Sequence, residues 1–132
     1  MTEAQLTQKH LDACRALMPG CEALKHSDRF NGGYPDATVT WRRRTTWWET
    51  KFYDDKTFKS PPVQKLQCAR LAVQGVCYYI IYVRIGDEKQ TRIVHPALLA
   101  HWDTHSEIEV ATGFNHTWVA NFIRNKHLEI HS

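Results

Sequence analysis

Residues 33–51 read Gly-Tyr-Pro-Asp-Ala-Thr-Val-Thr-Trp-Arg-Arg-Arg-Thr-Thr-Trp-Trp-Glu-Thr-Lys, and they carry both the main fold signal and the main chemical signal of the chain. The segments 36–41 and 46–53 are rich in β-branched and aromatic residues, which favours two strands. Residues 42–45 between them predict a turn. The stretch therefore predicts an antiparallel hairpin about Arg43.

Polar residues of this hairpin predict a metal-dependent phosphodiesterase site. Side chains alternate faces along a strand, so Glu49 and Lys51 point the same way. Asp36 begins the neighbouring strand and can reach the same place across the hairpin. Two carboxylates, the backbone carbonyl of Thr50 and water form the oxygen-rich site that Mg²⁺ or Mn²⁺ prefers. Lys51 would then orient the attacking water or contact the phosphate. The alternative is a salt-bridge cluster on an exposed sheet edge.

The flanking segments predict helices and further strands. Residues 3–18 have the apolar spacing of an amphipathic helix, with Thr2 as its N-cap and Pro19-Gly20 as its end. Residues 61–74 predict a second helix, capped by Ser60 and ended by Gly75. A helix between two strands is the crossover that parallel pairing requires. Further elements are expected at 21–28 (short strand), 76–84 (apolar central strand), 96–102 (short helix) and 116–125 (short helix).

These elements predict an α/β fold with a mixed central sheet of about four strands flanked by helices. The whole chain, residues 1–132, is expected to be a single domain. Residues 86–132 match no recognisable pattern and are expected to be a C-terminal extension of that domain.

Composition narrows the class of protein. No apolar run approaches the length of a membrane span, which predicts no membrane partner. The polar, acidic start predicts no secretory signal, and the cytoplasm is the simplest location. The four cysteines form no CxxC pair, which argues against a zinc knuckle and favours reduced thiols. The net charge of +3 permits nucleic-acid binding without arguing for it.

Several short segments together carry a family resemblance. They are Gly33-Tyr34-Pro35-Asp36, Trp48-Glu49-Thr50-Lys51, Gln64 in the second helix, and Gln74-Gly75 before an apolar strand. This arrangement resembles the PD-(D/E)xK nuclease superfamily, which has the restriction-endonuclease-like fold. It is most similar to the VRR-NUC type of phages, bacteria and structure-specific repair nucleases, and to phage Holliday-junction-resolvase-like domains. The resemblance covers about Glu3 to Val83, and Thr50 departs from the usual aliphatic residue.

The resemblance implies a function and roles for the matching residues. Asp36 and Glu49 would ligate Mg²⁺ or Mn²⁺, Lys51 would assist the attacking water, and Gln64 would support the site. Glu3 would be an additional ligand from the first helix. The implied activity is endonucleolytic hydrolysis of duplex or branched DNA, in the cytoplasm of a bacterium or a phage-infected host. Nucleases of this class often act on two strands at once, which favours a homodimer.

Basic and aromatic residues near the motif are candidates for DNA contact. The expected phosphate contacts are Arg42, Arg43, Arg44, Lys56 and Lys59, and solvated turn residues are the alternative. The tryptophans 41, 47 and 48 are expected mainly in the core, with base stacking as the alternative. Glu22 is a rival acid if its segment is a strand beside Asp36. His101 and His105 have helical spacing but lack the metalloprotease glutamate, so capping or solvation is favoured.

A different class of function remains open. The same fold could be a catalytically decayed binding or inhibitor protein that acts on a nucleic-acid machine. Asp36, Glu49 and Lys51 are all present, which argues against decay. A structural phage protein with a coincidental motif is a third interpretation.

Overall fold

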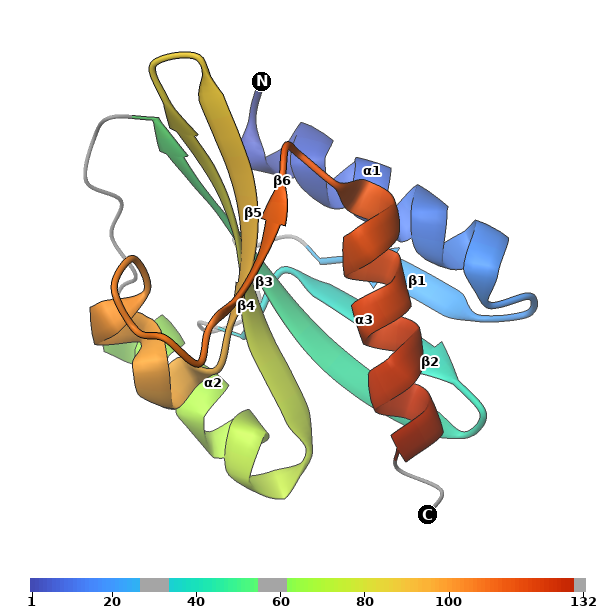
Figure 1. The fold of residues 1–132 in the computed structure, drawn as a ribbon. Coiled ribbons are helices and arrows are strands. Elements are labelled where there is room, and N and C mark those ends of the chain that lie inside the picture. Colours follow the sequence, from blue (N-terminus) through green and yellow to red (C-terminus); the bar gives the residue numbers. More distant parts are fainter. Residues whose placement is uncertain (27–33, 55–61, 130–132) are drawn as a thin grey trace.

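The computed structural model describes residues 1–26, 34–54 and 62–129, which form a sheet with helices on both faces (Figure 1). In chain order the elements are α1 (Glu3–Leu17), β1 (Glu22–Lys25), β2 (Ala37–Trp41), β3 (Arg44–Asp54), α2 (Pro62–Gln74), β4 (Val76–Ile85), β5 (Glu88–Val94), η2 (Pro96–His101), β6 (Glu109–Thr112) and α3 (His116–Glu129). The element η2 is a 3₁₀ helix. The predicted α/β architecture with a mixed sheet is confirmed.

The sheet has six strands in the order β1-β2-β3-β4-β5-β6. β3 and β4 are parallel and are joined by α2, as the crossover pattern predicted. The other neighbouring strands are antiparallel. The prediction of about four strands is wrong, because β5 and β6 add to the sheet from the unassigned segment 86–132. β5 buries little more than Thr91, Ile93 and Val94, so its sequence is mostly polar and shows a weak strand signal.

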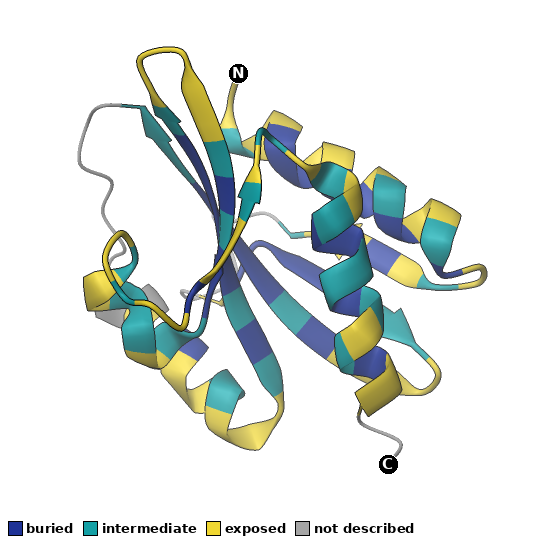
Figure 2. Ribbon diagram, viewed as in Figure 1, coloured by how far each residue is buried: buried dark blue, intermediate teal, exposed yellow. Residues whose placement is uncertain are grey.

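The helices divide between the two faces of the sheet. α1 and α3 cover one face, where Leu6, Leu11, Trp48, Ile80 and Ile123 belong to one core cluster. α2 and η2 lie over the other face, where a second cluster includes the buried side chains of Cys68, Tyr79, Ile81, Val94 and Ile108. Burial is concentrated in the middle of the sheet and on the inner sides of α1 and α3 (Figure 2).

The first helix begins where the sequence predicted. The backbone N–H of Gln5 donates to the Thr2 hydroxyl at 3.1 Å, and the Thr2 N–H donates to the Gln5 side-chain oxygen at 2.8 Å. This reciprocal capping box satisfies two N–H groups that the helix itself leaves unpaired. It fixes the start of α1, so the position of Glu3 in the first turn is fixed as well.

The other predicted features have mixed outcomes. Gly75 follows α2 as expected, whereas the predicted cap Ser60 lies outside the described residues. All four cysteines carry free thiols, in agreement with the sequence prediction. No helix within the described ranges is both long enough and apolar enough to cross a bilayer.

Candidate active site

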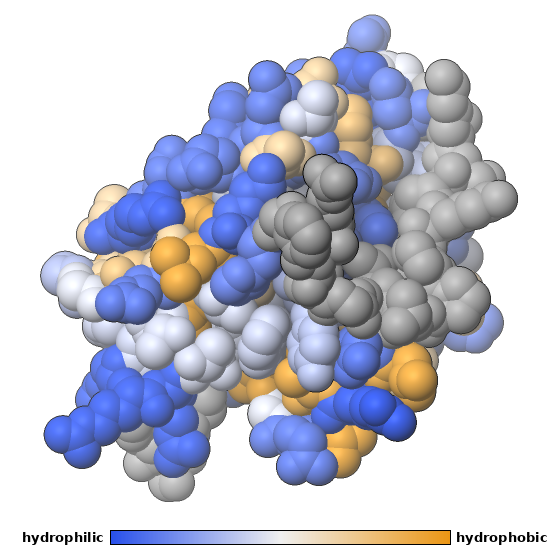
Figure 3. Space-filling model, turned by 180° about the vertical axis from the view of Figure 1, so that it is seen from behind, coloured by the Kyte–Doolittle hydropathy of each residue, from blue (hydrophilic) through white to orange (hydrophobic). Residues whose placement is uncertain are grey.

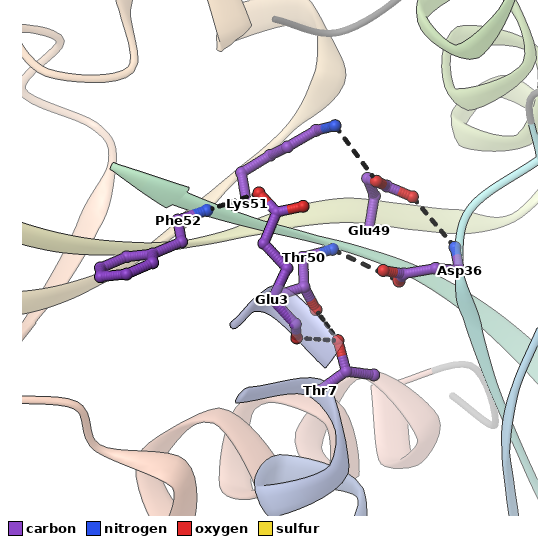
Figure 4. A network of polar contacts seen from close by, with 7 residues as sticks. All are labelled: Glu3, Thr7, Asp36, Glu49, Thr50, Lys51 and Phe52. Carbon is purple, nitrogen blue, oxygen red and sulfur yellow. Dashed lines mark hydrogen bonds and ion pairs between the residues drawn. The ribbon is translucent and has the colours of Figure 1, made fainter. Parts of the chain in front are cut away.

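The candidate site lies at the first residue of β2, beyond which β3 continues without β2 beside it. Pairing between these strands ends at Ala37 and Trp48, while β3 runs on to Asp54 beside β4 alone. On the side left open by β2, carboxylates accept the backbone N–H groups of β3. The Thr50 N–H donates to Asp36 Oδ1 at 3.4 Å, and the Phe52 N–H donates to Glu3 Oε2 at 2.9 Å (Figure 4).

Asp36 and Glu49 are brought together across the hairpin, as the sequence predicted. The backbone N–H of Asp36 donates to Glu49 Oε1 at 3.0 Å. Only 7 % of Asp36 and 2 % of Glu49 is exposed. Two buried carboxylates from neighbouring positions of a hairpin are stabilised by a cation or by hydrogen-bond donors beside them. The arrangement therefore favours a positive charge at this point of the sheet.

Lys51 supplies one such charge. Its Nζ lies 3.4 Å from Glu49 Oε2, and both side chains are nearly fully buried. Glu49 and Lys51 are two residues apart on β3 and share the sheet face that carries α2. A buried ammonium group with a carboxylate partner beside it can face a bound phosphate without leaving its own charge unpaired.

Thr50 connects the site to α1. Thr50 Oγ1 and Thr7 Oγ1 are 2.7 Å apart, and Thr7 Oγ1 lies 2.9 Å from the Glu3 carbonyl. The Thr7 hydroxyl is the donor in both contacts, so its single proton is shared between the Glu3 carbonyl and Thr50 Oγ1. Both threonines are fully buried. This chain of hydrogen bonds gives Thr50 a role that an aliphatic residue cannot fill, because it holds the first turn of α1 against β3.

The donor set fits a hard divalent cation. The carboxylates of Asp36, Glu49 and Glu3 surround the open edge of β3. The N–H and C=O of one strand residue point to the same side, so the Thr50 carbonyl is directed toward Asp36. Oxygen atoms of this kind are what Mg²⁺ and Mn²⁺ take. Within the described part of the chain, no three His, Cys, Asp or Glu side chains already converge as metal ligands. A cation here would use Asp36, Glu49, the Thr50 carbonyl and water, with Glu3 as a further carboxylate nearby.

The three arginines predicted to contact phosphates lie at the other end of the hairpin from Asp36. Arg42 and Arg43 form the tight turn between β2 and β3, both with positive φ (53° and 67°), and Arg44 begins β3. This turn is roughly 15–20 Å along β2 from Asp36. The helix residue Gln64 belongs to α2, but its side chain lies outside the described residues. Lys56 and Lys59 also lie outside them.

Glu22, the alternative acid, and His105 lie away from the candidate site. Glu22 pairs with Thr40, about 13 Å along β2 from Asp36, so it is not part of the site. The backbone N–H of Glu107 donates to His105 Nδ1 at 3.2 Å, which makes His105 a local cap.

Sequence reasoning missed Thr7, His26 and the contact of Tyr34 with Trp47 beside the site. Thr7 is one helical turn after Glu3, and that spacing is a signal that could have been found. Tyr34 and His26 each pack against the ring of Trp47, on the same strand as Glu49. No local sequence pattern links these three rings, because they come together only through the pairing of β1, β2 and β3.

No protein-family model matches the chain, and no curated protein sequence matches it either.

Proposed function

We propose that this protein is a metal-dependent endonuclease that hydrolyses DNA phosphodiester bonds, with Asp36, Glu49 and Lys51 at its active site. The observation that carries the proposal is the meeting of two buried acids and a buried lysine at the open edge of β3. We also propose that α1, β1–β4 and α2 form a restriction-endonuclease-like core, to which β5, β6 and α3 are added.

Each residue of the proposed active site has a distinct role in catalysis. Asp36 and Glu49 would hold the cation together with the Thr50 carbonyl, and Glu3 would contribute a further carboxylate from α1. When bound, Mg²⁺ or Mn²⁺ stabilises the charge that develops on the phosphate and lowers the pKa of a bound water. Lys51 stays beside Glu49 and orients the attacking water toward the phosphorus. The burial of all three residues excludes bulk water, which strengthens these interactions.

A DNA substrate has consequences for the location and the oligomeric state of the protein. DNA as substrate implies a cytoplasmic location in a bacterium or an infected host. Cleavage of both strands of a duplex or a branched junction by sites of this size favours a homodimer. The competing function is a nuclease-fold protein that binds or inhibits without cleaving.

The deciding experiment measures cleavage and metal binding together. Plasmid, linear duplex and four-way junction DNA are incubated with Mg²⁺, with Mn²⁺ and with EDTA, and Mn²⁺ affinity is measured by calorimetry. We expect Asp36→Asn and Glu49→Gln each to lower cleavage by at least about 10³-fold, because metal stabilisation is worth several kcal/mol. The exposed acids Asp103 and Glu109 provide the matched controls Asp103→Asn and Glu109→Gln.

The controls should cleave at the wild-type rate. Cleavage by Asp36→Asn or Glu49→Gln at that rate would remove these acids from the metal site. A wild-type protein that binds no Mn²⁺ and cleaves none of the three substrates would favour the binding or inhibitor function.

A further inference from the structure

Aromatic rings form a patch beside the proposed active site, on the face of the sheet that carries α2. The ring centroid of Tyr34 lies 5.6 Å from that of Trp47, and the His26 ring lies 6.1 Å from it. Tyr34 is 38 % exposed, and Trp47 and His26 are half-buried. These three residues are called the aromatic patch below. Trp47 packs in part against the second core cluster, and the remaining ring surface of the patch is open to contact.

The aromatic patch is adjacent to the acids. Trp47 and Glu49 are two residues apart on β3 and point to the same face, which places their Cα atoms about 7 Å apart. A nucleotide spans a similar length along a strand of nucleic acid. A base that lies on the Trp47 ring would therefore have a phosphate close to Glu49.

Hydroxyl groups lie next to the aromatic patch. Thr38 pairs with Trp47, and its Oγ1 lies 2.7 Å from His26 Nε2. Further along the same strands, the hydroxyls of Thr40 and Thr45 are 2.8 Å apart. Figure 3 shows this side of the molecule, where weakly polar surface lies between strongly hydrophilic margins.

This chemistry distinguishes between forms of nucleic acid. A duplex is bound mainly through its phosphates, by a surface dense in lysine and arginine. Aromatic rings instead stack on bases, and they can do so only when the bases are unpaired. Hydroxyls add neutral hydrogen bonds to phosphate oxygens without requiring positive charge. Aromatic rings with neighbouring hydroxyls thus favour a single strand.

We infer that the aromatic patch stacks the unpaired bases of a single-stranded DNA segment and so holds the adjoining phosphate at Glu49 and Lys51. This inference rests on the proposed function and makes it more specific. The preferred substrate is DNA with an unpaired segment, such as a flap or an open branch, rather than continuous duplex.

The test is binding without cleavage. Fluorescence anisotropy is measured with labelled oligothymidylate, with an abasic oligonucleotide of equal length, and with duplex DNA, all in EDTA. The protein carries Glu49→Gln, so no strand is cut. We expect oligothymidylate to bind more tightly than the abasic strand, because the two have the same phosphates and differ only in bases.

Variants of the aromatic patch give the residue-level test. Trp47→Leu and Tyr34→Leu should each weaken oligothymidylate binding about 5- to 150-fold, which is the value of one stacked base. Trp47→Phe keeps a ring and should restore most of the affinity. The control Trp118→Leu changes a half-buried tryptophan of α3, on the opposite face of the sheet, and should leave binding unchanged. Circular dichroism establishes that each variant is folded.

The outcomes separate this inference from the proposed function. Equal affinity for the thymidylate and abasic strands, or unchanged binding by both leucine variants, would overturn the role of the patch. Tighter binding to duplex would overturn it as well. If base-dependent binding through Trp47 is found but no variant or metal ever supports cleavage, the single-strand surface stands and the nuclease proposal fails.

Discussion

Lys51 is the residue whose role is most sharply tested. Its Nζ lies 3.4 Å from Glu49 Oε2, so it neutralises part of the acid charge without being a metal ligand. We expect Lys51→Met, which keeps the aliphatic bulk, to slow cleavage about 10²- to 10³-fold, because a positioned charge at the reacting phosphate is lost. The affinity for Mn²⁺ should stay the same or increase, since Glu49 loses a competing cation.

Single-turnover cleavage and Mn²⁺ calorimetry measure the two effects separately. Lys65→Met changes an exposed lysine of α2 and serves as the control. If folded Lys51→Met loses Mn²⁺ binding, then Lys51 organises the metal site instead of acting on water.

His10 makes folding stability depend on pH. Its Nδ1 lies 2.8 Å from the Tyr82 hydroxyl, which lies 3.1 Å from His116 Nδ1. Complete burial, and to a lesser degree His116, lower the pKa of His10 to about 3. Below about pH 6.5 the His10 side chain is protonated in the unfolded chain but not in the folded chain. The contribution of His10 to the free energy of unfolding is therefore complete above that pH and falls as the pH drops toward 3.

The expected loss from His10 is roughly 3–5 kcal/mol between pH 6.5 and pH 3. His10→Leu removes this part of the dependence while the Tyr82–His116 hydrogen bond remains. The pKa of His116 is also lowered, mainly by burial and further by Lys9, so both proteins keep that contribution. Urea denaturation at several pH values measures the difference. Parallel pH profiles for the two proteins would show that His10 is not a neutral buried residue.

At the scale of elements, local signals were sufficient for some segments and insufficient for others. The capping box at Thr2 and the β-branched runs of β2 and β3 are short-range features, and the elements they predicted are present. Glu49 and Lys51 could be placed on one face because alternation along a strand is local. β5 and β6 were missed because they are stabilised by pairing with β4 and with each other, because β5 is mostly polar, and because β6 has only four residues.

The candidate active site, too, could be predicted only where its contacts are local in the sequence. The sequence predicted that Asp36 and Glu49 meet, since the two are linked by one hairpin. It gave no way to place Glu3, whose contact with the Phe52 N–H depends on how α1 packs on β3. It also could not show that Thr50 bonds to Thr7, because that contact joins residues far apart in the chain. Tertiary packing decides such contacts, and local propensity does not.

At the scale of the whole molecule, the hairpin turn and the acids lie at opposite ends of β2. Arg42 and Arg43 have positive φ, a conformation that costs an ordinary residue about 1–2 kcal/mol and that Asn-Gly adopts readily. The Arg42 guanidinium lies 5.7 Å from the Trp41 ring centroid, which offsets part of that cost. Arginines kept in an unfavourable turn suggest a function for their charge, and DNA phosphates are the partner that the proposed activity supplies.

Replacing Arg42 with Asn and Arg43 with Gly in one variant should therefore have opposite effects on stability and on binding. The free energy of unfolding should rise by about 1 kcal/mol, because the strain is relieved. DNA affinity should fall for every sequence alike, and the log–log salt dependence should flatten by about two units, since two phosphate contacts are lost.

Arg44→Gln is the matched control: it removes one charge from a residue in ordinary strand conformation, so it should flatten the slope by about one unit with little change in stability. Denaturation and anisotropy across a range of salt measure both quantities. An unchanged slope in both variants would mean that the DNA contacts the acids and the aromatic patch without reaching the far end of the hairpin.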